Sequence, residues 1–144
     1  MKLEKSEKIW IDGSFIPWHD ANVHVLTHTL HYGLGVFEGI RCYQVHKKKS
    51  AVFRLHEHID RLFNSAIVLG IDIPFSKKEI ITAVLQVVKK NKLEECYIRP
   101  IVFLGHNQMG LNPSGVDVRV AIAAWPWGAY LGDEGINGGI RVRI

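Results

Sequence analysis

The chain has 144 residues, of which 47% are hydrophobic and 22% are charged, and its formal net charge at pH 7 is +4. This composition is typical of a folded domain and argues against a disordered or fibrous chain. No segment approaches the roughly 20 apolar residues that span a bilayer, and residues 1–8 lack the apolar centre of a signal peptide, so we expect a cytoplasmic protein without a membrane segment.

The positive charge does not indicate a binding site for a polyanion. The cysteines and histidines do not indicate a metal site. The lysines are spread along the chain without interleaved aromatic residues, which favours a solvated surface over a nucleic-acid interface. Cys42 and Cys96 each lie in an apolar run without CxxC spacing, so we expect two buried thiols. His24, His28 and His31 recur at helical spacing, but no further ligands follow at regular spacing, and we predict no metal site.

The first third of the chain predicts two antiparallel hairpins. Residues 9–11 and 15–16 are apolar, strand-like segments on either side of Asp12-Gly13. This pair readily takes the positive φ angles of a two-residue turn. Residues 39–45 and 51–54 predict a second pair of strands, joined by a charged turn.

The middle of the chain predicts two helices. Apolar residues fall on one helical face from Leu55 to Leu69, and Gly70 supplies a C-terminal stop. A second helix is expected to begin at Ser76, because Glu79 completes the spacing of a capping box.

Two later segments, residues 96–104 and 116–125, are too apolar for surface ribbons and predict the central strands of a sheet. The fold class expected is α+β, a two-layer sandwich of a mainly antiparallel sheet with two helices. We expect residues 1–127 to form a small N-terminal domain, the glycine-rich residues 128–139 to be an interdomain linker, and residues 140–144 to be the first strand of a missing C-terminal domain.

Three places could carry chemistry. Residues 31–43 concentrate glycine and aromatic residues around one carboxylate and one guanidinium, which suits either a ligand site or a tight bend with aromatic packing. Tyr97 and Arg99 share one face of an apolar strand, where the guanidinium needs a partner, either a ligand or an internal acid such as Glu38. Arg61 lies off the apolar face of the first helix and could bind a phosphate or be solvated.

Short motifs along almost the whole chain occur in a single order that matches a known family. They are Val23-His24, His31-Tyr32-Gly33, residues 36–41 (VFEGIR), residues 52–54 (VFR), Glu57-His58, Arg61-Leu62, residues 97–100 (YIRP), residues 109–113 (MGLNP) and residues 127–132 (WGAYLG). This series resembles the class IV, or fold-type IV, aminotransferases that use pyridoxal 5'-phosphate (PLP), and within them the bacterial branched-chain amino acid aminotransferases.

The resemblance implies a role for particular residues. Arg61 would bind the phosphate of the cofactor, which fits the match of a guanidinium to a phosphate. The residues expected at the substrate are Phe37, Tyr97, Arg99, Tyr130, Met109, Leu111 and Tyr32. Among them, Tyr97 would reach the α-carboxylate and Arg99 the distal carboxylate of glutamate or 2-oxoglutarate. Tyr32 and the loop carrying Met109 and Leu111 would enter the neighbouring subunit's site, which implies at least a homodimer.

The implied activity is transamination of leucine, isoleucine and valine with 2-oxoglutarate, giving branched 2-oxo acids and glutamate. The lysine that forms a Schiff base with PLP is expected beyond Ile144, so we predict no catalytic residue in this chain and no activity of the chain alone. The alternatives are a D-amino acid transaminase or an aminodeoxychorismate lyase of the same fold, or a non-catalytic domain that dimerises or binds a metabolite.

Overall fold

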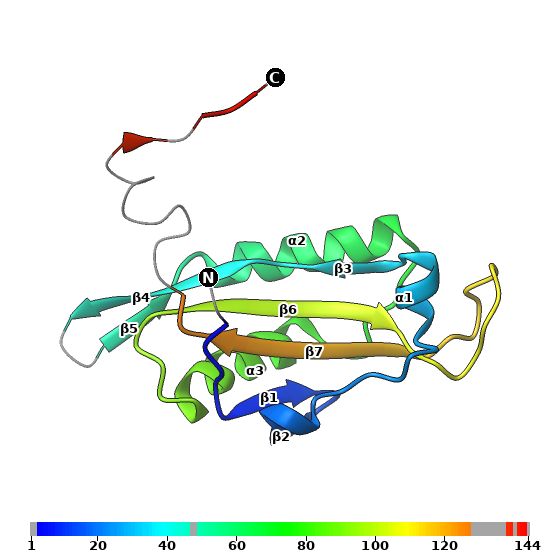
Figure 1. The fold of residues 1–144 in the computed structure, drawn as a ribbon, viewed down its shortest axis with the longest axis horizontal. Coiled ribbons are helices and arrows are strands. Elements are labelled where there is room, and N and C mark those ends of the chain that lie inside the picture. Colours follow the sequence, from blue (N-terminus) through cyan, green and yellow to red (C-terminus); the bar gives the residue numbers. More distant parts are fainter. Residues whose placement is uncertain (1–2, 47–48, 128–137, 140, 144) are drawn as a thin grey trace.

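The computed structural model describes residues 3–46, 49–127, 138–139 and 141–143. Groups of two or three strands are separated by helices along the chain (Figure 1). Their bounds are β1 (Lys8–Ile11), β2 (Ser14–Pro17), the 3-10 helix η1 (Trp18–Asp20), α1 (His28–Tyr32), β3 (Gly35–Phe37), β4 (Ile40–His46), β5 (Lys49–Val52), α2 (Leu55–Val68), α3 (Lys77–Lys90), β6 (Cys96–Leu104) and β7 (Val118–Trp125).

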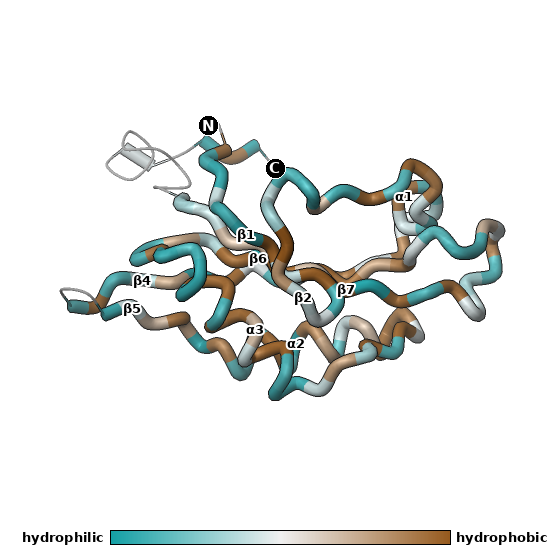
Figure 2. The backbone as a smooth tube through the Cα atoms, turned by 90° about the horizontal axis from the view of Figure 1, so that it is seen from below, coloured by the Kyte–Doolittle hydropathy of each residue, from teal (hydrophilic) through white to brown (hydrophobic). Residues whose placement is uncertain are grey.

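The seven strands form one sheet in the order β2-β1-β7-β6-β4-β5, with β3 also paired to β6. Every pairing is antiparallel. The long strands β6 and β7 lie at the centre, as their apolar sequences predicted. Helices α2 and α3 both cover one face, which gives the two layers seen in Figure 2. The predicted α+β two-layer sandwich is therefore confirmed.

Strands β3 and β4 pair with the same edge of β6, one after the other, and the pairing is interrupted at Glu38 and Gly39. Val36 pairs with Val102 and Ile40 pairs with Ile98 in the same register. Between them Glu38 faces Pro100 and donates its N–H to the Pro100 carbonyl at 3.0 Å. Proline has no N–H to return, so the ladder loses a hydrogen bond at this point.

The core lies between the sheet and the two helices. Ile40 and Ile98 of the sheet are fully buried, as are Ile59 and Leu62 of α2 and Val84 of α3. Replacing one of these isoleucines or Leu62 with alanine would cost about 2–5 kcal/mol. Neither α2 nor α3 covers the second face of the sheet, and the short helix α1 lies at one end of it (Figure 2).

Most sequence-based elements are confirmed. The first hairpin turns at Asp12-Gly13, both with positive φ, and α3 begins with the predicted capping box of Ser76 and Glu79. Cys42 and Cys96 are free and buried. Burial raises the pKa of the Cys96 thiol to about 12, which makes it chemically inert.

Several boundaries and elements differ from the prediction. The last strand begins at Val118 rather than at residue 116. Arg54, predicted as the end of a strand, is the residue before α2 and has a φ of 45°. The short helix α1 was not predicted, because five residues are too few to display a helical period.

The C-terminal elements predicted from the sequence lie largely outside the residues that the structure describes. Within residues 128–139, only 138 and 139 are described, so the linker stays a prediction. Residues 141–143 have no strand, and residues 140 and 144, which the predicted strand also needs, are outside the described part. No helix in the described residues is long and apolar enough to cross a membrane.

Candidate active site

Strand β6 presents two polar side chains on the face of the sheet that the helices leave open. Tyr97 and Arg99 lie two residues apart and share this face, whereas Ile98 between them is fully buried on the helix side. Arg99 Nη2 donates a hydrogen bond to the hydroxyl of Tyr97 at 2.8 Å. The guanidinium carbon also lies 4.3 Å from the ring centre of Phe37, a cation–π distance. The structure thus brings together three of the predicted substrate residues.

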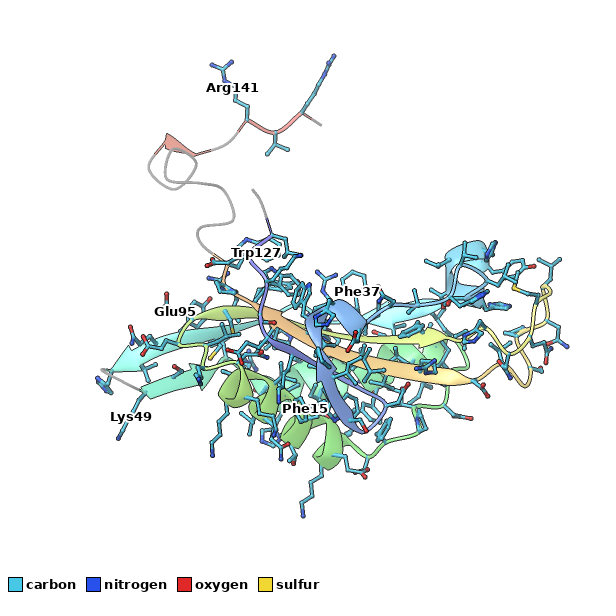
Figure 3. All side chains as sticks on the ribbon, turned by 60° about the horizontal axis from the view of Figure 1, so that its bottom comes forward. Phe15, Phe37, Lys49, Glu95, Trp127 and Arg141 are labelled. Carbon is cyan, nitrogen blue, oxygen red and sulfur yellow. The ribbon has the colours of Figure 1, made fainter. Side chains whose placement is uncertain are left out.

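Two tryptophans extend this cluster and were not predicted. The ring of Tyr97 lies 5.2 Å from that of Trp125 and 4.7 Å from that of Trp127. Figure 3 shows Phe37 and Trp127 on the face of the sheet away from the two helices. The signal was present in the sequence, because Trp125 and Trp127 are two residues apart at the end of an apolar strand, where alternation puts them on one side.

A glycine makes room for the tyrosine hydroxyl. Gly39 lies beside Tyr97, and a Cβ built at position 39 would overlap the Tyr97 hydroxyl. Of the two interpretations of segment 31–43, aromatic packing against a glycine is observed here. Any other residue at position 39 would displace Tyr97 and with it the partner of Arg99.

Glu38 points to the opposite face from Phe37 and forms a buried ion pair. Its side chain is 4% exposed. Arg61 donates from Nε and Nη2 to the two carboxylate oxygens at 2.5 and 2.7 Å, and His58 Nδ1 lies 2.8 Å from Oε2. Burial by itself would raise the pKa of the Glu38 carboxyl, but the hydrogen bonds and charges of Arg61 and His58 hold that pKa below its usual value.

This geometry corrects one alternative from the sequence. A salt bridge between Arg99 and Glu38 is wrong, because Glu38 lies on the helix side of the sheet and its oxygens bond Arg61 and His58. Among the described residues, Arg99 forms no ion pair with a carboxylate. Its partners there are a hydroxyl and aromatic rings, which leave its positive charge uncompensated.

Arg61 is held by Glu38 but remains open to a ligand. Its side chain is 67% exposed although two of its nitrogens are bound. It lines a surface hollow of about 350 Å³ together with Phe53, Arg54, Glu57 and His58. The third guanidinium nitrogen, Nη1, has no hydrogen-bond partner within the described chain. An oriented guanidinium with a free N–H suits a phosphate oxygen.

The remaining predicted substrate residues lie elsewhere. Tyr32 ends α1, and Met109 and Leu111 lie in the loop between β6 and β7, beyond the end of β6 opposite to Tyr97. All three are exposed, Leu111 to 86%. Figure 1 shows α1 and this loop at one end of the sheet, and the β4–β5 hairpin at the other. Tyr130 lies outside the described residues.

Comparison with known proteins identifies a family and several relatives that match this chain. Residues 35–143 match the model of the family described as amino-transferase class IV. A branched-chain-amino-acid aminotransferase of Pseudomonas aeruginosa is 54% identical over 135 residues, which cover 94% of this chain and 44% of that protein. The relative from Escherichia coli K12 is 48% identical and is matched over 100% of this chain and 47% of its own length. The chain therefore spans less than half the length of these relatives.

Solved structures agree with the sequence comparison. The branched-chain amino acid aminotransferase of Escherichia coli superposes with a TM-score of 0.87 and 48% identity over 91% of this chain and 43% of that one. The T.th. branched-chain amino acid aminotransferase complexed with N-(5'-phosphopyridoxyl)-L-glutamate gives a TM-score of 0.82 and 45% identity over 86% of this chain and 42% of that one. The fold, the order of the motifs and these matches lead to one conclusion: the chain belongs to the amino-transferase class IV family.

Proposed function

We propose that this chain is the small domain of a longer PLP-dependent aminotransferase that exchanges amino groups between leucine, isoleucine or valine and 2-oxoglutarate. The observation that carries the proposal is the Arg99 guanidinium, which lies against Tyr97 and Phe37 on an apolar face without a carboxylate partner among the described residues. The relatives named above, all branched-chain aminotransferases, support the same substrate class.

The residues present fit the phosphate of PLP. Arg61 is fixed in orientation by two bonds to Glu38, and it still offers Nη1 at a surface hollow. A charged donor that is already oriented loses little conformational entropy when it binds. PLP, when bound, would supply the electron sink that lets the amino group leave the substrate carbon. Within the described residues, Arg61 and its carboxylate anchor would contribute only the grip on the phosphate.

The open face of the sheet suits two substrates of different polarity. A branched side chain can lie on Phe37 and the rings around Tyr97, where it is removed from water. Glutamate brings a second carboxylate, and Arg99 at the edge of this apolar wall can bind it through a charge-assisted hydrogen bond. One wall thus serves both half-reactions, and we assign Tyr97 to the α-carboxylate and Arg99 to the distal carboxylate. We also place Tyr130 at this pocket, on the family resemblance alone.

A second subunit completes the proposed site. Tyr32, Met109 and Leu111 expose apolar surface at the end of the sheet away from Tyr97. Within one chain they therefore do not contact the cluster around Arg99. We propose that they line the substrate pocket of a neighbouring copy in a homodimer.

The decisive experiment is to extend the reading frame past codon 144 and to purify the complete product with PLP. We expect a second domain with a lysine bound to PLP, and an absorbance change when leucine is added. D-alanine or aminodeoxychorismate turnover without leucine turnover would instead identify one of the related enzymes. A stop codon after Ile144 would refute the full-enzyme proposal and favour a non-catalytic binding domain.

A further inference from the structure

His28 is a fully buried imidazole at the first residue of α1. Burying a polar ring is unfavourable unless it forms hydrogen bonds, and an apolar side chain would fill the same space without that cost. The bonds that His28 makes therefore indicate why a histidine is suited to this position.

His28 is bonded to the loop between β6 and β7 at two points. Its backbone N–H donates to the carbonyl of Gly105 at 2.6 Å, where the loop begins. Its ring nitrogen Nε2 lies 2.9 Å from the carbonyl of Gly110, in the middle of the loop. A carbonyl only accepts, so Nε2 carries the proton. The other nitrogen, Nδ1, has no hydrogen-bond partner in the described part of the chain.

The Gly110 carbonyl lies at the centre of the loop, between the two residues whose side chains are proposed to bind substrate. Gly110 stands between Met109 and Leu111, and its φ of 128° is one that other residues rarely adopt. The base of the loop is closed separately, because the Asn107 side chain bonds Gly115 and Asp117. The Gly110 carbonyl receives its hydrogen bond from outside the loop, from the ring of His28.

The same ring also contacts the residue that ends α1. The rings of His28 and Tyr32 lie 4.4 Å apart between their centres. One side chain therefore fixes the tip of the loop and packs against the exposed tyrosine of the helix. Figure 1 shows these two elements side by side at one end of the sheet.

We propose that His28 is a positioning residue that holds Met109 and Leu111 in a fixed place relative to Tyr32. This inference rests on the proposed function, in which these three side chains complete the substrate pocket of the neighbouring subunit. His28 itself is buried, so it would act through the loop and not by contact with the substrate. Its bond to Gly110 orders the loop before substrate binds, so that binding does not have to order it.

The test compares two substitutions at position 28 in the longer polypeptide. His28→Met removes the donor and keeps an apolar side chain, whereas His28→Gln retains an N–H near the position of Nε2. We expect His28→Met to raise KM for leucine about 5-fold, the effect of one lost hydrogen bond, with kcat changed by less than about 2-fold. His28→Gln should restore most of the KM. His19→Met, at a side chain that is 81% exposed, is the control and should change neither constant.

Amide hydrogen exchange measures the loop directly and does not depend on activity. We expect residues 106–112 to exchange faster in His28→Met than in His28→Gln or the unsubstituted protein. Equal exchange and equal KM in all three proteins would overturn the proposal. Equal damage from both substitutions would also overturn it, because packing and not the donor would then be responsible.

A second variant covers the case in which His28→Met does not fold. Asn107→Ala opens the base of the same loop from an exposed position. We expect a higher KM for leucine and faster exchange of the loop, and an unchanged KM with a loosened loop would contradict the proposal. Failure of the unsubstituted polypeptide to transaminate leucine would refute the proposed function instead, and the exchange measurements would still decide the role of His28.

Discussion

The hydroxyl of Tyr97 packs against Gly39, in the space that a Cβ at position 39 would need. The same hydroxyl accepts the hydrogen bond from Arg99. The absence of a side chain between β3 and β4 thus sets the position of a guanidinium on β6. This relationship links a packing constraint to the proposed recognition of a carboxylate.

We expect Gly39→Ala to destabilise the fold by about 1–3 kcal/mol, because the added methyl group must push the Tyr97 ring away. Urea unfolding measures this cost. Tyr97→Phe removes the nearest atom of the overlap, so Gly39→Ala should cost less in that background. An equal cost in both backgrounds would show that the tyrosine hydroxyl is not the obstacle.

Arg99→Met should separate the two substrates of the complete enzyme. We expect KM for 2-oxoglutarate to rise about 10- to 100-fold, since a hydrogen bond to a charged group is lost, while KM for leucine changes by less than about 3-fold. Steady-state kinetics with each substrate varied in turn measure this. Arg119→Met is a suitable control, because Arg119 lies on the neighbouring strand β7 and is paired with Asp12. A similar rise for leucine would contradict the assignment of Arg99.

Arg61→Gln should weaken binding of PLP about 10-fold or more, because a charged donor to the phosphate is lost. Pyridoxal, which has no phosphate, provides the matched control and should bind equally to both proteins. Equilibrium titration followed by absorbance measures both affinities. If Arg61→Gln weakened pyridoxal as much as PLP, Arg61 would act on the fold and not on the phosphate.

Glu38 should make stability depend on pH in the acid range. Its pKa is lower in the folded protein than the value of 4.5 for a free carboxyl, so the unfolded chain binds more protons between the two values. The stability that the ionised carboxylate contributes is therefore present above about pH 4.5 and is lost as the pH falls through the folded-state pKa. Arg61 and His58 are the charged groups that face it.

Glu38→Gln tests this dependence by removing the titrating group. We expect the substituted protein to be less stable at pH 7, by about 1–3 kcal/mol for a buried partner lost, and to lose less further stability between pH 6 and 3 than the unsubstituted protein. Denaturant unfolding at a series of pH values measures both. Parallel curves for the two proteins would contradict the role given to Glu38.

Local sequence rules predicted much of the fold. The alternation of buried and exposed residues along β6 put Tyr97 and Arg99 on one face, because successive side chains of any strand point to opposite sides. The capping box fixed the start of α3 at Ser76. The same rules missed α1, which is too short to show a period.

The partners of charged residues could not be predicted in this way. Arg61 bonds Glu38, a residue 23 positions away in the chain, and that bond depends on α2 lying against the segment between β3 and β4. From the sequence alone, Arg99 was as good a candidate partner for Glu38 as Arg61, because no local pattern shows which of two arginines pairs with a given acid.

The sequence by itself determined the alternating strands, the amphipathic helices and the family resemblance, because each of these depends on residue types at fixed spacing. The tertiary structure decided which side chains meet across strands. Trp125 flanks Tyr97 through the register of β6 and β7, and Gly39 admits its hydroxyl through the register of β4 and β6. Register is a property of two strands together, and it is set by the packing of the whole sheet against its helices.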